Sequence, residues 1–597
     1  MRDKIKSIVL LAARRAWGGV EIPEFSVEIP ELPEHGDYST NIALILARTL
    51  KKPPLEIADA VVTELKTQSN KEHWFQTEIK TPGFINFYIS PQQLAENIKT
   101  ILKKKQKFGQ GSKKKAKPRT VARSGSSARE TVIIEYSSPN IAKPMGVHHL
   151  RTTIIGQALV NIYTFLGYRV LAMTFPGDWG TQFGSLIAAY KKWGNHKKMR
   201  KNPIQEMLNL YVRFSQMAEH DEGFQEEAKK EFKKLENGDK ENKKIWRWFR
   251  KESFKDFDRV YKKLGVKIPY IFSESFFEPM LKAVIAEALN KKIAQKGEDG
   301  SVIIPLATEK TPLLLQKSDG ATLYATRDLA QMKYRVKKWR PGKIVFVVAN
   351  QQTFHFKQVF EAAHKLGYAP GVELAHVKFG MVLDSSGKKF ATREGKLIPL
   401  ETVIDEAVRR ARKMIDDLDK LQQKAKPRTV ARSAPSAGEK QKISRMVGIG
   451  ALKFFDLAQN RMSDIIFDWD KMLNLKGASA PYLQYSYARL KNIIRKTGAL
   501  RSDLDIKLLK EKEELALARH LMHFGETVAE AATHYEPNKI ANYLIKLAEK
   551  INSLYETVPI LPAEKKIRDS RLALISAAMI IIKSGCNLLG IEMPERM

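Results

Sequence analysis

The amino-acid sequence predicts a multidomain α/β protein, in which a parallel-sheet domain lies between an N-terminal α+β domain and a C-terminal all-α domain. Three observations support this fold class. The chain has 597 residues, 43% of them hydrophobic, which is enough for about three to five domains of ~150 residues each. Strand-like and helical patterns alternate through the middle of the chain, and beyond about residue 401 the patterns are helical.

Residues 1–110 carry both kinds of pattern. Apolar residues recur at helical spacing in "KIKSIVLLAARRAW" and "TNIALILARTL", whereas "GFINFYIS" alternates as a strand does. We therefore expect an α+β domain over this range.

A basic segment of sixteen residues occurs twice, at Lys115–Glu130 and Lys424–Glu439, and the first ten residues of the two copies are identical. Both copies are poor in apolar residues, so they lack the material for a packed core. They predict exposed, disordered insertions at 111–130 and 424–439. The alternative is a pair of basic arms that contact RNA phosphates.

Residues 131–400 predict the parallel-sheet domain. The strand-like "TVIIEY" is followed by apolar residues at helical spacing from Leu150 to Leu166, and then by the strand-like "YRVLAMTF". Such a strand–helix–strand unit opens a Rossmann-type nucleotide-binding fold. A charged helical stretch at about 191–300 looks inserted. Residues 401–445 are expected to form a connector, and residues 446–597 a helical domain.

Composition narrows the partners and the compartment. A net charge of +36 implies a polyanionic partner, most simply a nucleic acid, although a bias in lysine usage would give the same charge. The single cysteine, Cys586, excludes a disulfide framework and fits a reducing cytoplasm. The apolar run "LALISAAMIII" is far shorter than the ~20 residues that cross a bilayer. We expect a soluble, cytoplasmic protein that binds no membrane.

His148 and His149 lie where the first strand of this domain gives way to the helix. A helix N-terminus offers free N–H groups and a partial positive charge, and imidazoles there can stabilise charge on a nucleotide's α-phosphate. By themselves, two histidines at a helix start are more often solvent-facing or capping residues.

Further motifs favour the phosphate-binding interpretation of these two histidines. The segments "EYSSPNIAKPM", "GDWGTQFG", "LYATRDLA" and "GALKFFDLAQNRMSDIIFDWDKM" resemble the arginyl-tRNA synthetases, which are class I aminoacyl-tRNA synthetases. The resemblance extends from His35 to Met597, apart from the two insertions. It implies a Rossmann-type catalytic domain, an N-terminal domain that binds the tRNA elbow, and a C-terminal helical bundle that binds the anticodon.

One signature of the family is altered. The family carries a His-x-Gly-His pattern, and this chain reads Gly-Val-His-His at residues 146–149. His149 matches the second histidine, but Gly146 and His148 are exchanged relative to that pattern. Either His148 reaches the phosphates from the neighbouring position, or it crowds the adenine and slows the enzyme.

The segment "KKFATREGK" resembles the second family signature, a cationic loop that can neutralise the pyrophosphate leaving group. Without the resemblance, it would be read as a basic hairpin tip. The resemblance implies catalytic roles for His148, His149, Lys389 and Arg393. It implies ATP contacts for Lys143, Gly146, His148, His149, His355, Lys389 and Thr392.

Selection of arginine needs carboxylates and an aromatic wall, because its guanidinium is planar and carries five donors. Tyr324 and Asp328 lie four apart, on one helical face, and could supply the ring and the acid. Alternatively, Tyr324 is a core residue and Asp328 a surface acid. The resemblance adds Glu135 and Asn140 near the substrate's α-amino group and carboxylate, Gln352 near the guanidinium, and Ser137.

The implied reaction is that of an arginine–tRNA ligase. L-arginine and ATP give arginyl-adenylate, and the arginyl group then passes to the 3′ end of tRNA(Arg). Mg²⁺ is expected to accompany ATP through its phosphates, without a protein metal site. The family typically needs bound tRNA for the first step, and a monomer is the default.

RNA contacts are expected at both ends of the chain. Asn86 and Phe87 are candidates for the elbow; Tyr482, Tyr485, Tyr487 and Arg489 are candidates for stacking on anticodon bases, although the tyrosines could instead pack the bundle.

Two rival functions are a catalytically impaired RNA-binding paralogue, resulting from the Gly146/His148 exchange, and another nucleotidyltransferase of the same superfamily.

Overall fold

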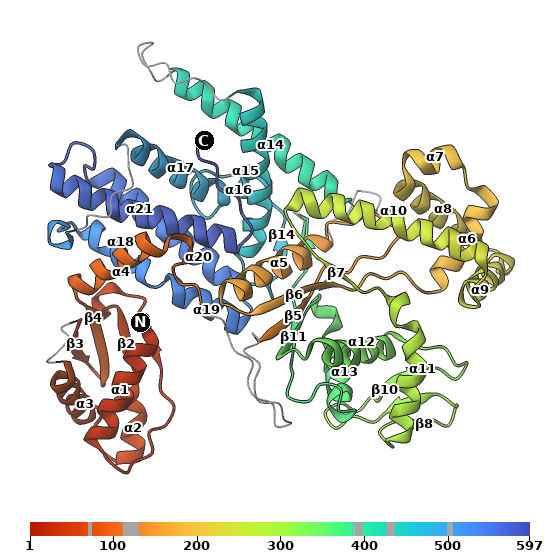
Figure 1. The fold of residues 1–597 in the computed structure, drawn as a ribbon, viewed down its shortest axis with the longest axis horizontal. Helices are drawn as coiled ribbons and strands as arrows, with labels where there is room; N and C mark the ends of the chain where they lie inside the picture. Colours follow the sequence, from red (N-terminus) through yellow and green to blue (C-terminus); the bar gives the residue numbers. More distant parts are fainter. Residues whose placement is uncertain (70–73, 112–129, 385, 389–397, 425–435, 498–504) are drawn as a thin grey trace.

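The computed structural model describes residues 1–69, 74–111, 130–384, 386–388, 398–424, 436–497 and 505–597 (Figure 1). The two predicted insertions therefore lie largely outside the described residues. The end of the second one is helical, in contrast to the prediction, because Ser436 and Glu439 form a capping box that starts α15 (Ala437–Leu457).

The N-terminal domain is an antiparallel sheet in the order β1-β2-β4-β3, covered by helices. It is followed by a helix that leads to the rest of the protein, begun by Ser90 as N-cap and Pro91 at the first position. The elements are α1 (Arg2–Ala16), β1 (Val27–Glu28), η1 (Pro33–His35), β2 (Tyr38–Thr40), α2 (Ile42–Leu50), α3 (Pro54–Ser69), β3 (Phe75–Lys80), β4 (Phe84–Ile89), α4 (Pro91–Lys104) and η2 (Lys105–Lys107).

The central domain is built on a parallel sheet of five strands in the order β12-β11-β5-β6-β7, as the sequence predicted. Every residue of β5 is buried, which explains its unbroken apolar sequence. The strands are β5 (Thr131–Glu135), β6 (Arg169–Thr174), β7 (Tyr270–Ile271), β11 (Lys343–Val347) and β12 (Glu373–Val377). The helices around them are α5 (His149–Phe165), α6 (Thr181–Trp193), α11 (Glu274–Asn290), α12 (Tyr324–Trp339), η3 (Asn350–Gln352) and α13 (Thr353–Lys365).

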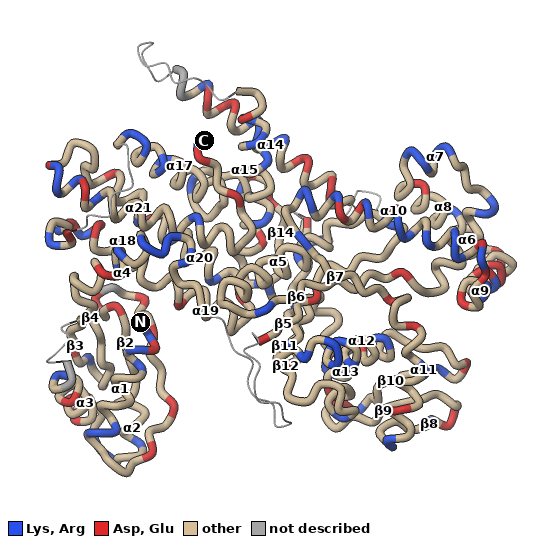
Figure 2. Tube along the Cα trace, in the orientation of Figure 1, with Lys and Arg blue, Asp and Glu red and all other residues tan. Residues whose placement is uncertain are grey.

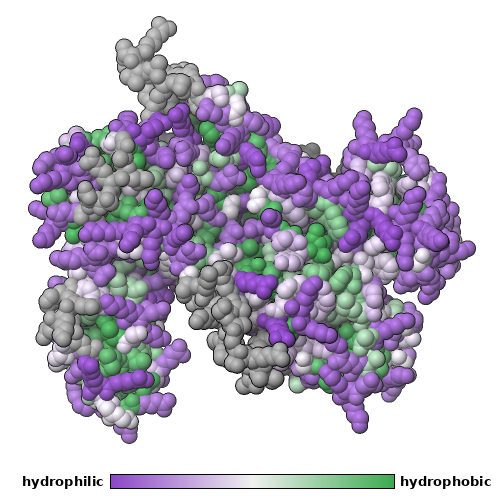
Figure 3. Space-filling view, viewed as in Figure 1, coloured by the Kyte–Doolittle hydropathy of each residue, from purple (hydrophilic) through white to green (hydrophobic). Residues whose placement is uncertain are grey.

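Four helices project from the sheet between β6 and β7: α7 (His196–Lys201), α8 (Pro203–Ala218), α9 (Glu222–Glu236) and α10 (Lys240–Leu264) (Figure 1). On the face shown in Figure 3 their surface is mostly hydrophilic, and Figure 2 shows basic residues gathered on α7. The insertion expected at about 191–300 is shorter than predicted, because β7 pairs with β6 and belongs to the main sheet. A separate antiparallel sheet follows, formed by β8 (Gln295–Lys296), β9 (Val302–Ile304) and β10 (Leu313–Gln316).

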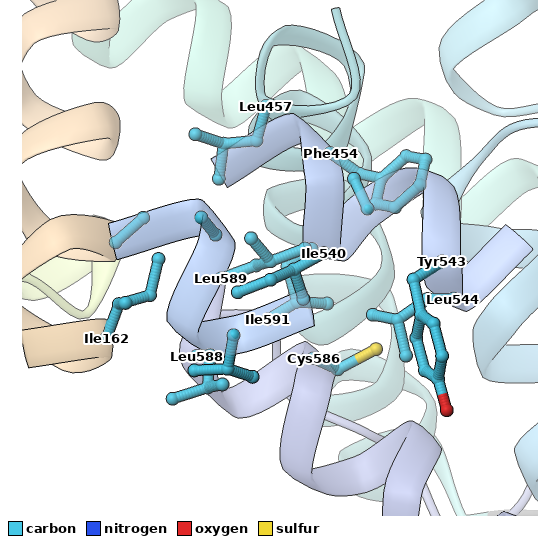
Figure 4. Close-up of a cluster of buried hydrophobic side chains, with 14 of the residues drawn as sticks. Ile162, Phe454, Leu457, Ile540, Tyr543, Leu544, Cys586, Leu588, Leu589 and Ile591 are labelled. Atoms are coloured by element: carbon cyan, nitrogen blue, oxygen red, sulfur yellow. The ribbon is translucent and has the colours of Figure 1, made fainter. Parts of the chain in front are cut away.

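The rest of the chain is mainly helical. The elements are β13 (Val382–Leu383), α14 (Leu400–Lys424), β14 (Ile465–Ile466), α16 (Trp469–Met472), α17 (Ala480–Thr497), η4 (Ile506–Leu508), α18 (Lys512–Met522), α19 (Phe524–His534), α20 (Pro537–Thr557) and α21 (Lys565–Leu588). Figure 4 shows Cys586 of α21 inside an apolar cluster that also includes Ile162 of α5, so the bundle and the central domain share a core.

Among the described helices, α21 alone is long and apolar enough to cross a membrane, by length and composition. However, 83% of its most apolar stretch is buried inside the protein. It is therefore a core helix of the bundle.

Candidate active site

The sheet places Glu135, Ser137, Asn140 and Gln352 at or just beyond the carboxyl ends of its strands. The connection after β5 leads to β6 on one side, whereas the connection after the adjacent strand β11 leads to β12 on the other side, so the strand order reverses between β5 and β11. In parallel sheets, ligands bind in the crevice at such a point. The loops after β5 and β6 are joined there, because the backbone N–H of Ile141 donates to the carbonyl of Gly177 at 3.0 Å.

Helix α5 is fixed to this edge by its own polar residues. The Thr152 hydroxyl donates to the Val347 carbonyl of β11 at 2.7 Å and accepts the backbone N–H of Ser137 at 3.0 Å. On the far side of α5, Arg151 forms a buried ion pair with Asp456 of α15, at 3.1 Å. The first turn of α5 is therefore held between the sheet and the helical domain.

Ser137 has a different surrounding from the one expected. It adopts a left-handed backbone conformation with φ of 55°, and its buried hydroxyl lies 2.6 Å from Thr153 and 3.0 Å from Tyr261. These hydroxyl contacts tie the end of β5 to α5 and α10. The Ser137 side chain is therefore buried between these elements and does not line an arginine pocket.

His149 is the first residue of α5, and the rings of His148 and His149 lie 3.9 Å apart. The backbone N–H of Gly146 donates to Nδ1 of His149 at 3.1 Å. Burial, together with the neighbouring His148, lowers the pKa of His149 to about 3, and burial lowers the pKa of His148 as well. His149 is therefore neutral at pH 7, and because Nδ1 accepts, its proton lies on Nε2.

The signature loop also anchors one end of the segment that contains the second signature. Gly146 forms a β-bridge with Pro399, and the backbone N–H of Leu400 donates to the Met145 carbonyl at 2.7 Å. On the other side of that segment, β13 pairs in parallel with β14. Lys389, Thr392 and Arg393 lie outside the described residues, so only the two ends of their segment are placed.

Lys143 points toward the helical insertion. Its Nζ lies 4.6 Å from the centre of the Tyr211 ring on α8. A cation over an aromatic face is stabilised there. The ATP contact predicted for Lys143 would require it to leave that ring.

Glu135, expected near the substrate's α-amino group, is paired inside the protein. Its carboxylate forms an ion pair with Arg335 of α12, and both side chains are buried. Burial raises the pKa of Glu135, against the opposing effect of Arg335. Asn140, by contrast, is exposed at the crevice, with its Oδ1 close to Gly177. Asn140 is thus better placed than Glu135 to touch a ligand.

Asp328 and His355, predicted to bind arginine and ATP respectively, touch each other. His355 Nε2 lies 2.6 Å from one carboxylate oxygen of Asp328, and Gln331 donates to the other oxygen at 2.6 Å. Burial alone would lower the pKa of His355, but the bond to Asp328 leaves it raised. Tyr324, at the start of α12, is 67% exposed, which rules out the core role considered for it. Gln352 is exposed in η3.

Glu274, which sequence reasoning missed, is a buried acid at the same edge. It begins α11, and its Oε2 accepts the backbone N–H of Trp179 at 3.4 Å. A Cβ on Gly177 would meet both Asn140 Oδ1 and Glu274 Oε2, so these groups converge. Burial raises the pKa of Glu274 to about 7, against the opposing effect of Arg327. The chain has 66 acidic residues, and nothing in the sequence singles this one out.

The predicted elbow contacts are corrected by the structure. Phe87 and Asn86 lie in β4 and are both buried, and Asn86 accepts the Ser39 hydroxyl at 2.7 Å. A ring that is buried in the core of the domain cannot stack on a base without unfolding it.

The predicted anticodon residues divide into two groups. Tyr487 is buried in the bundle, as the packing alternative had it. Tyr482 and Tyr485 are half-buried, and the Tyr482 hydroxyl accepts from Asn552 at 2.8 Å. The Arg489 guanidinium lies 5.4 Å from the ring of Tyr485 and 4.1 Å from that of Tyr555. Half-buried rings and a cation are therefore available along one side of α17.

Comparisons with known protein families match consecutive parts of the chain. Residues 2–89 match the family "Arginyl tRNA synthetase N terminal domain". Residues 115–469 match "tRNA synthetases class I (R), catalytic domain", and residues 483–597 match "DALR anticodon binding domain". The parallel sheet, its signature loop and the C-terminal bundle thus define a class I aminoacyl-tRNA synthetase.

Individual relatives narrow the class. The arginine–tRNA ligase of Halothermothrix orenii is 36% identical over 97% of this chain and 96% of its own length. That of Lactococcus lactis subsp. cremoris is 37% identical over 100% and 99%. The chain belongs to the arginyl-tRNA synthetases.

Solved structures agree in fold. The arginyl-tRNA synthetase of Plasmodium falciparum superposes with a TM-score of 0.81 at 25% identity, covering 100% of this chain and 99% of that one. The Thermus thermophilus enzyme also gives a TM-score of 0.81, at 22% identity, with full coverage of both chains.

Proposed function

We propose that this chain joins L-arginine to the 3′ end of tRNA(Arg) in two ATP-dependent steps. As an arginyl-tRNA synthetase, it is an arginine–tRNA ligase that uses ATP. In the first step, a carboxylate oxygen of arginine attacks the α-phosphorus of ATP and pyrophosphate leaves. In the second, a terminal ribose hydroxyl of the tRNA attacks the acyl carbon and AMP leaves. Neither step requires a covalent bond to the protein, so positioning and charge stabilisation carry the catalysis.

The phosphate contact is assigned to the start of α5. The observation that carries it is the hydrogen bond from Gly146 to Nδ1 of His149, since it leaves a donor on Nε2. A neutral imidazole can donate that proton to a phosphate oxygen without itself ionising. His148, whose exposed ring lies against His149, supplies the second donor from the position exchanged with Gly146. Lys143, His355 and the segment with Lys389, Thr392 and Arg393 remain proposed contacts of ATP.

The arginine contact is assigned to two acids on different helices. Glu274 is the first residue of α11, and Asp328 lies near the beginning of α12. Both side chains are largely buried. Two carboxylates can bind a guanidinium through paired hydrogen bonds, and Tyr324 offers an exposed ring as a wall. Asn140 and Gln352 are proposed for the polar ends of the substrate. Glu135 is proposed to support the site through its ion pair with Arg335, without touching the substrate.

Mg²⁺ is proposed to arrive with ATP. In the part of the chain that the structure describes, no group of three or more His, Cys, Asp or Glu side chains could hold a metal ion. The ATP phosphates offer the oxygen ligands that Mg²⁺ prefers. When bound there, Mg²⁺ would neutralise charge on the phosphates.

The RNA is proposed to lie along both outer domains. Arg489, with Tyr482 and Tyr485, offers a cation and rings to the anticodon, and the N-terminal domain faces the elbow. Bound tRNA is proposed to be required for adenylate formation. A cytoplasmic monomer remains the proposed state.

Aminoacylation and tRNA-dependent pyrophosphate exchange, measured with each amino acid in turn, test this function. Of the amino acids tested, we expect turnover only with arginine. In the exchange assay, we expect no turnover when tRNA is left out. No turnover with arginine at micromolar enzyme would reject the ligase and favour the impaired RNA-binding paralogue.

A further inference from the structure

The segment "HGDYSTN", His35 to Asn41, carries part of the sequence resemblance, but the structure turns two of its side chains away from the surface. The ring of Tyr38 is 0% exposed. Its hydroxyl donates to the two carboxylate oxygens of Glu526, at 3.0 Å each, and Glu526 lies in the first turn of α19 in the bundle. The contact joins residues almost five hundred positions apart, across two domains.

The neighbouring residue makes a second contact with the bundle. Asp37 accepts the backbone N–H of Ile89 at 2.7 Å within its own domain, and its other oxygen lies 3.3 Å from Nε of Arg519 in α18. Gly36, just before Asp37, lies close to the backbone of Phe87. A Cβ on Gly36 would lie 2.7 Å from the Phe87 carbonyl oxygen, and the φ of Gly36 is 84°. This close approach fixes where Asp37 and Tyr38 can point.

The bundle side is built to receive them. The ring of His523 meets Tyr38 edge-on, with centroids 5.2 Å apart, and its Nδ1 lies 3.8 Å from Glu526. Glu526 also accepts the backbone N–H of Arg2 at 2.6 Å. Burial would raise the pKa of Glu526, but His523, the amino group of Met1 at 2.8 Å and the backbone of Arg2 hold it at about 2, so the carboxylate is charged throughout the working range.

We propose that Asp37, Tyr38, Arg519, His523 and Glu526, termed the latch, hold the N-terminal domain on the bundle at one spacing, and that this spacing sets the affinity for tRNA. The inference rests on the proposed placement of the RNA on both domains. Two binding surfaces on one ligand reinforce each other only when their separation matches that of the ligand. Latch residues are positioning residues, since none touches the reacting atoms.

Loosening the latch should not detach or unfold the domain. Helix α4, which leads out of it, packs separately against α18 and α21. The apolar cluster that contains Ile42, Ile85 and Phe87 continues into the bundle and does not include Glu526, so it can still hold the domain when Glu526 is changed. A latch variant is therefore expected to keep its folded domains and to lose only their fixed spacing.

The test compares Tyr38→Phe and Glu526→Gln with Tyr88→Phe in the full chain. Tyr88 lies in β4 of the same domain, and its hydroxyl donates to Glu78 and to the Glu34 carbonyl at 2.7 Å, without crossing to the bundle. Steady-state aminoacylation should show the KM for tRNA raised about five- to tenfold in both latch variants. The kcat, and the KM values for arginine and ATP at saturating tRNA, should stay within about twofold of the parent.

A tRNA(Arg) transcript without its D arm separates spacing from a local defect. With that transcript, the parent and the latch variants should have equal KM values, because the elbow contact is already lost. Equal KM values with intact tRNA would overturn the latch while leaving the ligase function intact. So would an equal effect of Tyr88→Phe, or an undiminished effect on the shortened transcript. An inactive parent would instead overturn the proposed function itself.

Discussion

The pKa of Glu274 gives a sharp test of the arginine site. If the ionised carboxylate binds the guanidinium, the affinity for arginine must rise as the pH rises through about 7, the raised pKa of this group. With that pKa, about a tenth of the molecules carry a charged Glu274 at pH 6 and about nine tenths at pH 8. The KM for arginine should therefore be about tenfold higher at pH 6 than at pH 8, a difference of about 1.4 kcal/mol.

The substitution Glu274→Gln removes the titrating group. The KM for arginine at pH 8 should rise at least tenfold, and most of its change between pH 6 and pH 8 should disappear. A residual change is expected from His355, whose protonated ring competes for Asp328. The assay is steady-state aminoacylation at saturating ATP and tRNA.

Glu287→Gln is the matched control on the same helix. Glu287 is paired with Lys291 and Lys333 and bonded to Tyr368, and these partners lower its pKa to about 2 despite burial, far from the tested range. This variant should keep the parental pH profile. A parental KM that is flat between pH 6 and pH 8, or a Glu274→Gln variant that keeps the full tenfold change, would refute the assignment.

Four further predictions follow from the site. His149→Ala should lower kcat at least tenfold, about 1.4 kcal/mol. An unchanged rate constant of adenylate formation in a single-turnover experiment would count against the phosphate contact. Gly146→His combined with His148→Gly should leave arginylation equal or higher, and a large loss would show that the exchanged order is itself required. Arg335→Met leaves Glu135 buried without its partner, which should cost about 3 kcal/mol or more of stability and lower the melting temperature in calorimetry; an unchanged melting temperature would contradict this. Deleting Lys115–Glu130 should keep arginylation within about threefold at moderate salt, where only a few phosphate contacts are at stake, and a steep loss would identify a basic arm.

The main architecture could be predicted because it depends on local patterns. The apolar run of β5 and the helical spacing of α5 are visible within a few residues of sequence. The two-residue strand β7 gives no such pattern, and it was placed in the insertion. Alternation in β4 indicates which residues share a face, but not which face is covered, and this is why Asn86 and Phe87 were assigned to RNA.

The pairing of charged residues could not be predicted. Glu135 meets Arg335, and Asp328 meets His355, through contacts between separate elements of the fold. Sequence separation gives no information on such contacts, and a charged residue that ends up buried looks like any other acid or base in the chain. The partners of these predicted site residues, and Glu274 itself, therefore could not be identified from the sequence.

The structure also narrows what the exchange of Gly146 and His148 can change. The bond that fixes the tautomer of His149 comes from the backbone N–H of residue 146, which is present whatever its side chain. Exchanging the two residues therefore leaves the Nε2 donor of His149 in place, and moves only the second imidazole by two positions. That imidazole now lies against His149, at 3.9 Å between ring centres, on the exposed side of the helix start. Any loss of rate relative to the family order should thus appear in the contribution of one donor, and not in a collapse of the site.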